Sequence, residues 1–261
     1  MDTVLSSRSS SVTIGAGHPF CVIGERINPT GRKRFAEELK SGEMSTASAD
    51  ARAQVEAGAD MLDVNAGIPL VDEAELLAQM LGAVSEAVDV PLCIDSSVIE
   101  ALEAGLAVYE GKALVNSVTA EDDRLEEILP LVARHGAAVI GLANDETGIP
   151  VTPEERLKHA TKIVSVAGDH GIPPEDVVID PLAMTVGADT EAVTITLETI
   201  SLIRRELGVN MCLGASNVSF GLPRRHQLGS AFLPMAMAAG LTSAIMSCAE
   251  EVVNSVRAAD L

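Results

Sequence analysis

Aromatic side chains are almost missing from this chain of 261 residues, which has no tryptophan, one tyrosine and four phenylalanines. Stacking platforms for nucleic-acid bases or sugars are therefore scarce, and the core must be aliphatic. No apolar run approaches the roughly 20 residues that a membrane-spanning helix requires. Residues 1–19 lack the basic and then apolar pattern of a secretory signal peptide, so we expect a cytoplasmic protein.

Closely spaced cysteines are also lacking. Cys21, Cys93, Cys212 and Cys248 show no C-x-x-C spacing, which disfavours a zinc site built from them. The first three lie within predicted strands, where a reduced and buried thiol is the expected state.

Positive charge is scarce as well. Lys and Arg number 18 against 38 Asp and Glu, which gives a formal net charge of -20. Nucleic acids and anionic membranes bind clustered cations, so neither is an expected partner. Solubility explains this acidity more simply than an acidic docking face does.

Short apolar runs alternate with longer amphipathic stretches along the chain, which is typical of parallel strands covered by helices on both faces. The apolar runs predict eight strands, at 20–24, 60–64, 90–95, 113–117, 137–143, 176–180, 210–215 and 242–247. Eight strand–helix units predict an α/β fold, a (β/α)8 TIM barrel. We expect one barrel domain over residues 19–261, preceded by a loose polar N-terminal arm over residues 1–18.

An open doubly wound sheet is the alternative fold. It would require a glycine-rich phosphate-binding turn after an early strand, whereas Gly15-Ala16-Gly17 precedes the first predicted strand. Helical spacing of apolar residues predicts helices over 73–88 and 190–207. Thr152 and Pro153 predict a helix start, and Pro130 is expected to delay or kink a helix over 124–134.

Asp or Asn recurs where the predicted strands end. In a parallel barrel these ends meet at one mouth, which is where such barrels carry out chemistry. Alternation along a strand places each of these residues on the same face as the residue two positions before it, so an inward face would bring them to the top of the barrel core. The strand-end residues are Asp63, Asn65, Asp95, Asn116, Asn144, Asp145, Asp180 and Asn217.

Helix capping is the alternative explanation for any one of these positions. It weakens when so many strand ends share the property, and Ser96 or Ser97 offers a cap that would free Asp95. Asn144 and Asp145 remain best explained by capping.

Several reaction classes lack their residues. No Lys lies in a predicted strand to form a Schiff base, and no Ser-His-Asp order is apparent. A histidine metal site is disfavoured because His135, His159 and His170 are predicted at or near helix C-termini. We expect no metal site, with a hard-cation site formed by Asp63, Asp95 and Asp180 as the minor alternative. A neutral heterocycle with an amidine-like edge, such as guanine or a pterin, fits the carboxylates and amides best.

The strand ends resemble those of the pterin-binding methyltransferases. These include the methyltetrahydrofolate:corrinoid protein methyltransferases and the folate domain of cobalamin-dependent methionine synthase. The resemblance covers roughly residues 20 to 255. The matching segments are Gly24-Glu25-Arg26-Ile27-Asn28, Leu62-Asp63-Val64-Asn65, Ile94-Asp95-Ser96, Val115-Asn116-Ser117, Ile179-Asp180-Pro181-Leu182 and Gly214-Ala215-Ser216-Asn217-Val218-Ser219.

Dihydropteroate synthase is a structural cousin of that family. Its usual Ser-Arg-Lys after the seventh strand is replaced here by Ser216-Asn217-Val218, and its Arg-Pro-Gly after the second strand is absent. A diphosphate leaving group needs such cations, so these departures disfavour the synthase. A dihydropteroate synthase-type enzyme and a non-catalytic folate-binding barrel remain the alternatives.

The resemblance implies transfer of a methyl group between N5 of tetrahydrofolate and the cobalt of a corrinoid (cobalamin). It implies that Asp95, Asn116 and Asp180 hold the pterin ring, and that Asn217 approaches N5 as the catalytic residue. Arg225 is implied to lie near the folate, and Glu25, Asn28, Asp63 and Asn65 to line the pocket.

The family pattern also implies a homodimer. No D-x-H-x-x-G segment for corrinoid binding occurs, so a partner corrinoid protein must carry the corrinoid. We favour transfer from the methylcorrinoid protein to tetrahydrofolate, as in O-demethylation systems, over the reverse use of 5-methyltetrahydrofolate. Two basic islands, 32–34 and 224–226, should lie near the mouth and hold the folate tail or dock the corrinoid protein.

Overall fold

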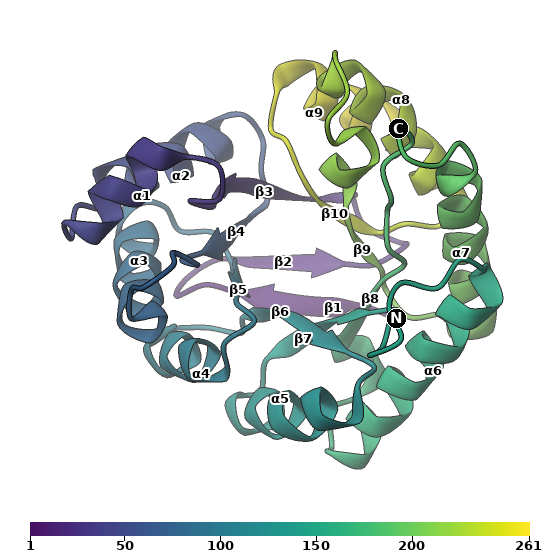
Figure 1. Cartoon of the computed structure of the whole chain (residues 1–261), viewed down its shortest axis with the longest axis horizontal. Helices are drawn as coiled ribbons and strands as arrows, with labels where there is room; N and C mark the ends of the chain where they lie inside the picture. Colours follow the sequence, from purple (N-terminus) through teal and green to yellow (C-terminus); the bar gives the residue numbers. More distant parts are fainter.

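The computed structural model describes all 261 residues and contains the eight predicted strands as a parallel barrel (Figure 1). The strands follow one another in the order β8-β7-β6-β5-β4-β3-β10-β9. A parallel bridge between Ile179 and Met211 joins the two outer strands, β8 and β9, so the barrel is nearly closed. The strands are β3 (Cys21–Ile27), β4 (Met61–Asn65), β5 (Leu92–Asp95), β6 (Leu114–Thr119), β7 (Ala138–Leu142), β8 (Val177–Asp180), β9 (Cys212–Gly214) and β10 (Ser243–Met246).

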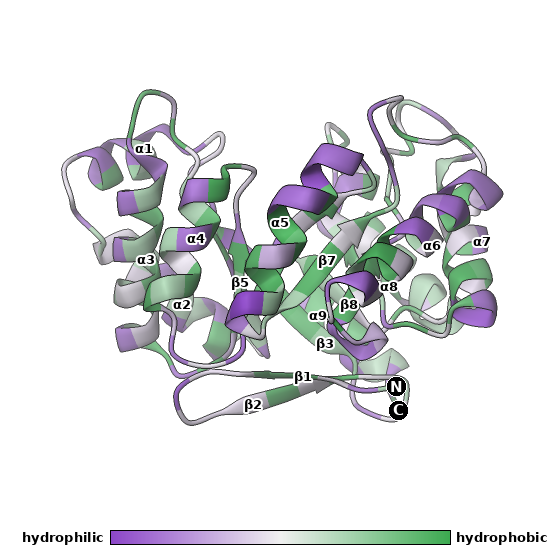
Figure 2. Ribbon diagram, turned by 90° about the horizontal axis from the view of Figure 1, so that it is seen from below, coloured by the Kyte–Doolittle hydropathy of each residue, from purple (hydrophilic) through white to green (hydrophobic).

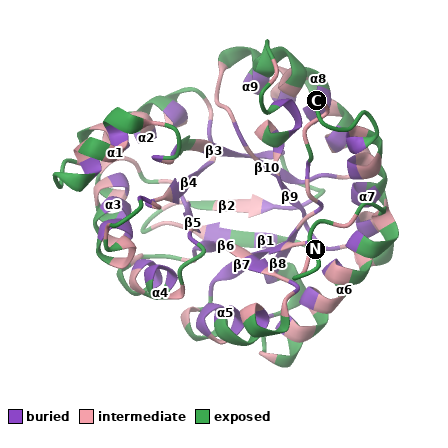
Figure 3. Ribbon diagram, viewed as in Figure 1, coloured by how far each residue is buried: buried purple, intermediate pink, exposed green.

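Helices surround the barrel, and their outer faces are exposed while the strands are buried (Figures 1 and 3). The predicted TIM-barrel class is therefore confirmed. The α-helices are α1 (Lys33–Lys40), α2 (Ser45–Glu56), α3 (Glu73–Ala87), α4 (Ile99–Val108), α5 (Asp122–His135), α6 (Pro153–Asp169), α7 (Ala192–Glu206), α8 (Arg225–Ala239) and α9 (Glu250–Ala259). Two 3-10 helices, η1 (Pro174–Asp176) and η2 (Ala215–Ser219), precede β8 and follow β9.

The predicted helix boundaries hold with two corrections. Thr152 caps α6 by accepting a hydrogen bond from the backbone N–H of Glu155 at 3.3 Å. Pro130 lies inside α5 and does not delay its start at Asp122. His159 lies in the middle of α6, not near its C-terminus, because the helix continues to Asp169, and its ring lies 3.6 Å from Asp145. None of the helices is long and apolar enough to cross a membrane.

Two apolar cores hold the fold. The larger one fills the space between the strands and the helices, and a smaller one fills the barrel interior. Cys21, Cys93 and Cys212 belong to the interior core as buried free thiols, as predicted. Burial raises the pKa of each of these thiols, which keeps them protonated and apolar.

The N-terminal arm is not loose, and that expectation was wrong. It forms an antiparallel hairpin of β1 (Thr3–Ser6) and β2 (Ser11–Ile14) that lies across one end of the barrel (Figure 2). The alternation of small polar and apolar residues in this segment turns Leu5 and Ile14 into the interior core, where both are 0% exposed. The hairpin therefore closes the barrel floor and leaves the opposite end as the open mouth.

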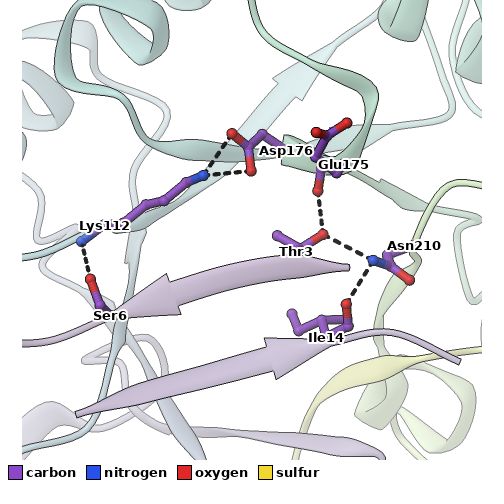
Figure 4. A network of polar contacts seen from close by, with 7 residues as sticks. All are labelled: Thr3, Ser6, Ile14, Lys112, Glu175, Asp176 and Asn210. Atoms are coloured by element: carbon purple, nitrogen blue, oxygen red, sulfur yellow. Dashed lines mark hydrogen bonds and ion pairs between the residues drawn. The ribbon is translucent and has the colours of Figure 1, made fainter. Parts of the chain in front are cut away.

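Polar contacts fasten the hairpin to the barrel (Figure 4). The side-chain amide of Asn210 donates to the carbonyl of Ile14 at 2.7 Å and to the hydroxyl of Thr3 at 3.0 Å. The backbone N–H of Lys112 donates to the Ser6 hydroxyl at 2.9 Å. The ammonium group of Lys112 lies 2.6 Å from Asp176 within the barrel. The backbone N–H of Ser6 also donates to the carbonyl of Lys112 at 3.1 Å, which pairs part of the edge of β1 with the barrel.

Candidate active site at the barrel mouth

The faces of β5, β6 and β8 that were predicted to point into the barrel do so in the structure. Cys93, Leu114 and Val178 belong to the interior core. Alternation then turns Asp95, Asn116 and Asp180, two residues later on the same strands, into the barrel one layer higher. Strand register places Asp95 beside Asn116, with Asn65 beside Asp95 on the other side.

These polar ends do not serve as helix caps. The N-cap residues of α4, α5 and α7 are Val98, Glu121 and Glu191. Ser96 accepts the backbone N–H of Val98 at 2.9 Å, which leaves the Asp95 side chain to the cavity.

A cavity of about 460 Å³ opens at this mouth, which is within the range for small-molecule sites. It brings together every predicted site residue except Asn65. The predicted residues that line it are Glu25, Asn28, Asp63, Asp95, Asn116, Asp180, Asn217 and Arg225. Arg32 lines it too, as expected for a basic island predicted near the mouth. Arg26, Thr30, Gly214, Ser216, Phe220 and Ile245 complete the lining and were not predicted.

Asn65 stands behind the cavity wall and orients Asp95. Its side-chain amide donates to an Asp95 oxygen at 3.0 Å, and its own oxygen accepts the backbone N–H of Gly67 at 2.9 Å. The second bond fixes the direction of the amide, so the donor faces the carboxylate. Asn65 is therefore a positioning residue in this geometry.

Asp63 and Asp95 form a buried carboxyl pair. Burial and then the Asp95 charge raise the pKa of Asp63 well above its usual range, and Asp63 is only 3% exposed. Burial raises the pKa of Asp95 to about 6, although the bond from Asn65 opposes this. Asn116 donates its side-chain amide to Asp63 at 3.1 Å, which leaves the Asn116 carbonyl oxygen to accept from a ligand.

Asp180 is held by backbone donors on the opposite side of the cavity. Its oxygens accept the N–H groups of Leu182 at 2.7 Å and Gly214 at 3.4 Å. Burial raises the pKa of Asp180 to about 6, against the effect of these bonds and of the nearby Arg156 charge.

Arg156 supports this side of the site and was missed from the sequence. It is 2% exposed, and its guanidinium donates to the carbonyls of Pro181 at 2.9 Å and Leu182 at 2.7 Å. The sequence did contain an indication of its burial, because Arg156 falls on the apolar face of α6, where Ala160 and Ile163 are the next buried positions.

Asn217 lies on η2 at the mouth, and its side chain is exposed. Its amide makes no hydrogen bond within the protein, so both its donor and its acceptor are free for a ligand. A Cβ at Gly214 would lie 3.0 Å from the Asn217 amide nitrogen, so this close approach favours glycine there.

Glu25 and Arg225 meet around Ser216 on the same side. The Ser216 hydroxyl donates to Glu25 at 2.8 Å, and Arg225 donates to the Ser216 carbonyl at 2.9 Å. Burial raises the pKa of Glu25, while the Ser216 bond and the Arg225 charge oppose the shift. The Arg225 guanidinium also lies 5.8 Å from the centre of the Phe220 ring.

Asn144 and Asp145 fall outside the site, since neither lines the cavity. The helix-capping explanation for them was wrong, because Thr152 caps α6 and Asp145 accepts the N–H of Thr147 at 2.9 Å within its own loop. No group of three or more His, Cys, Asp or Glu side chains is arranged to hold a metal ion.

Comparisons with known proteins agree on one family. Residues 24–247 match the family described as pterin binding enzyme. The chain is 32% identical over 246 residues to the methylcorrinoid:tetrahydrofolate methyltransferase of Eubacterium limosum, which covers 92% of this chain and 89% of that protein. It is 33% identical over 258 residues to the methionine synthase of Mycobacterium tuberculosis, covering 93% of this chain but 21% of that protein.

A solved structure has the same fold. It is described as Yersinia pestis DHPS with a pterine-sulfa conjugate, and it superposes with a TM-score of 0.74 over 98% of each chain. The sequence identity is 15%, so this likeness concerns the fold alone.

Proposed function

Because the chain belongs to the pterin binding enzyme family, we propose that it is a methyltransferase that moves a methyl group between N5 of tetrahydrofolate and the cobalt of a corrinoid. A partner corrinoid protein would carry the corrinoid as the second substrate. The observation that carries this proposal is the inner wall of the cavity, where Asp95, Asn116 and Asp180 present oxygen acceptors around one polar edge. The name of the Eubacterium limosum relative supplies the reaction class.

The pterin edge fits these acceptors by its hydrogen-bonding groups. A 2-amino-4-oxo ring carries several N–H donors on one side, and a carboxylate accepts two such bonds. With pKa values of about 6, Asp95 and Asp180 are mostly ionised at neutral pH and act as acceptors. Their burial means that a ligand without matching donors would leave them unpaired, which gives specificity.

Asn217 is the side chain proposed to act at N5. Its free amide donates to the lone pair of a neutral N5 or accepts from an N5–H group after it reorients. It therefore positions N5 and stabilises the charge that changes there during transfer. Asn217 supplies no proton, so protons at N5 exchange with solvent.

Transfer from the methylcorrinoid protein to tetrahydrofolate is the direction that we favour. In that direction the N5 lone pair attacks the methyl carbon, the carbon–cobalt electron pair stays on cobalt, and the N5 proton leaves to water. The Eubacterium limosum relative is named for this direction.

A homodimer and a cytoplasmic location also remain predictions of the sequence.

The purified chain provides the test. With tetrahydrofolate and methylcob(III)alamin it should form 5-methyltetrahydrofolate and cob(I)alamin, whose absorbance reports the rate. The pair 5-methyltetrahydrofolate and cob(I)alamin tests the reverse direction, and the ratio of kcat/KM values compares the two. Folate binding without transfer in either direction would instead support a non-catalytic barrel. Condensation of a pterin diphosphate with p-aminobenzoate would reveal a synthase.

A further inference from the structure

Arg156 is a buried cation whose guanidinium has no ionic partner. It is 2% exposed, and no ion pair in the structure includes it. Its hydrogen bonds go to backbone carbonyls instead, those of Pro150 at 3.0 Å, Pro181 at 2.9 Å and Leu182 at 2.7 Å. A buried charge without an anion is costly, and an apolar side chain would fit the buried face of α6 more simply. This cost indicates a role for the three bonds.

One of these bonds fixes a peptide group that Asp180 also uses. The Pro181 carbonyl and the Leu182 N–H belong to the same planar trans peptide, so they point in opposite directions. Arg156 donates to the carbonyl end, and the Asp180 carboxylate accepts the N–H end at 2.7 Å. Rotation of this peptide would break both bonds. The guanidinium therefore fixes the direction of the N–H that holds Asp180.

The conformation of Leu182 shows that this arrangement is held against strain. Leu182 has a φ of 67°, in the left-handed region that a side chain makes unfavourable. Its carbonyl accepts two donors in this conformation, the Arg156 guanidinium of α6 at 2.7 Å and the Thr196 hydroxyl of α7 at 3.0 Å. Backbone strain persists where the surroundings over-determine it, and it gathers at functional sites. This strain favours a role in the site over a role in packing alone.

We propose that Arg156 is a positioning residue, which directs the Asp180 carboxylate toward the ligand by fixing the 181–182 peptide. One carboxylate oxygen is then held by the N–H of Leu182, and the other accepts the N–H of Gly214 at 3.4 Å. The lone pairs that remain are available to a ligand in the cavity that Asp180 lines. That this ligand is a pterin rests on the proposed function, whereas the link from Arg156 to Asp180 does not.

Titration of Asp180 in the ligand-free chain reports on this link. Arg156 from α6 is the charged group that lowers the Asp180 pKa, against the larger effect of burial. The Cys212 thiol on the neighbouring strand β9 feels the Asp180 charge, and burial keeps that thiol protonated. Asp63 and Asp95 line the same cavity. Of these groups, only Arg156 differs in the variants that make the test.

Arg156→Lys is the decisive variant, because it keeps the buried charge but replaces a rigid fork with a flexible point charge. The midpoint of the Asp180 titration is about 6 in the wild-type chain. It should rise by about half a pH unit in Arg156→Lys, because a loosened N–H bond no longer favours the ionised form. Arg156→Met removes the charge as well, so the midpoint should rise by about one pH unit or more.

Carbon-13 NMR of labelled aspartates measures the midpoint, and Asp180→Asn identifies the signal. Arg134→Lys is the matched control, since it makes the same substitution at an exposed position of α5 and should leave the midpoint unchanged. Calorimetry at neutral pH adds the functional consequence. Tetrahydrofolate should bind about fivefold more weakly to Arg156→Lys, and within about twofold of the wild-type affinity to Arg134→Lys.

The outcomes separate this role from the proposed function. An unchanged midpoint in Arg156→Lys would mean that only the charge acts, which overturns the positioning role. Should that variant fail to fold, the wild-type chain decides, because the Leu182 amide should resist hydrogen exchange and its signal should shift at the Asp180 midpoint. Rapid exchange of that amide overturns the role. Absence of tetrahydrofolate binding by the wild-type chain overturns the proposed function and leaves the titration to decide on Arg156.

Discussion

At the scale of single residues, Asn217 carries the sharpest prediction about catalysis. Asn217→Ala removes the one side-chain amide of the cavity lining that makes no hydrogen bond within the protein, so transfer should slow on the order of 100-fold in kcat. The Kd for tetrahydrofolate should change by less than about threefold, because Asp95, Asn116 and Asp180, the proposed ligands of the ring, are left in place. Single-turnover transfer and calorimetry measure the two effects, and Asn144→Ala, outside the cavity, is the control. Transfer at the wild-type rate would remove Asn217 from its assigned role.

Asp180 links the site to stability. Burial raises its pKa from 3.8 to about 6, so the folded state holds the Asp180 proton more tightly than the unfolded chain does. The unfolded chain therefore releases this proton first, and the folded state is destabilised as pH rises from about 4 to about 6. Asp180→Asn should raise the free energy of unfolding by on the order of 2 kcal/mol at pH 8 and by less at pH 5.

Urea denaturation at the two pH values measures this gain, with Asp145→Asn as the exposed-loop control. The same variant should weaken tetrahydrofolate binding, because an amide replaces a charged acceptor. Equal stability of Asp180→Asn and the wild-type chain at pH 8 would contradict the raised pKa.

The site residues at the strand ends could be predicted because their placement depends on local sequence alone. Asp95, Asn116 and Asp180 follow apolar runs, and alternation alone puts them on the inner face. Arg156 could not be assigned, since its acceptors, the carbonyls of Pro181 and Leu182, belong to a distant loop. Gln54 was missed for the same reason, because it accepts the N–H of Arg26 from a different element.

At the scale of elements, the N-terminal hairpin should act as the floor of the barrel. Leu5→Ala deletes a side chain that is 0% exposed and should lower the free energy of unfolding by about 2–4 kcal/mol. Val4→Ala, on the opposite face of β1 and 49% exposed, should change it by less than about 0.5 kcal/mol. Urea denaturation of both variants compares the two faces, and equal effects would mean that β1 does not pack into the interior.

The hairpin was also the element that sequence patterns described least well. Its strands are short and rich in serine, and their apolar residues have no partner until the barrel floor exists. The barrel strands, by contrast, are nearly continuous apolar runs whose identity does not depend on a distant surface. The local sequence pattern therefore predicted the parallel strands of the barrel. It did not predict the hairpin over residues 3–14, because that hairpin depends on its contact with the barrel floor.

At the scale of the whole molecule, the mouth divides into two sectors. Arg32 and Arg225, at the starts of α1 and α8, line one sector, and exposed apolar side chains occupy loops that follow β4 and β7. Leu70 is 107% exposed and Val151 is 74% exposed on these loops. The proposed function places the transferred methyl group in the cavity, so a protein that carries a corrinoid would have to cover this mouth, and apolar side chains favour such a contact.

Charge placed in the apolar sector should therefore separate docking from chemistry. Leu70→Asp combined with Val151→Asp should lower kcat/KM with a methylated corrinoid protein by about tenfold, because a docked partner would bury two unpaired carboxylates. The rate with free methylcob(III)alamin should stay within about twofold, since neither side chain lines the cavity. Val108→Asp is the control, because Val108 is 53% exposed at the C-terminal end of α4 and lies beside Ser7 and Arg8 of the hairpin, at the floor end of the barrel. If the double variant lost activity equally with both substrates, the apolar sector would belong to the cavity chemistry, and another part of the mouth would receive the partner.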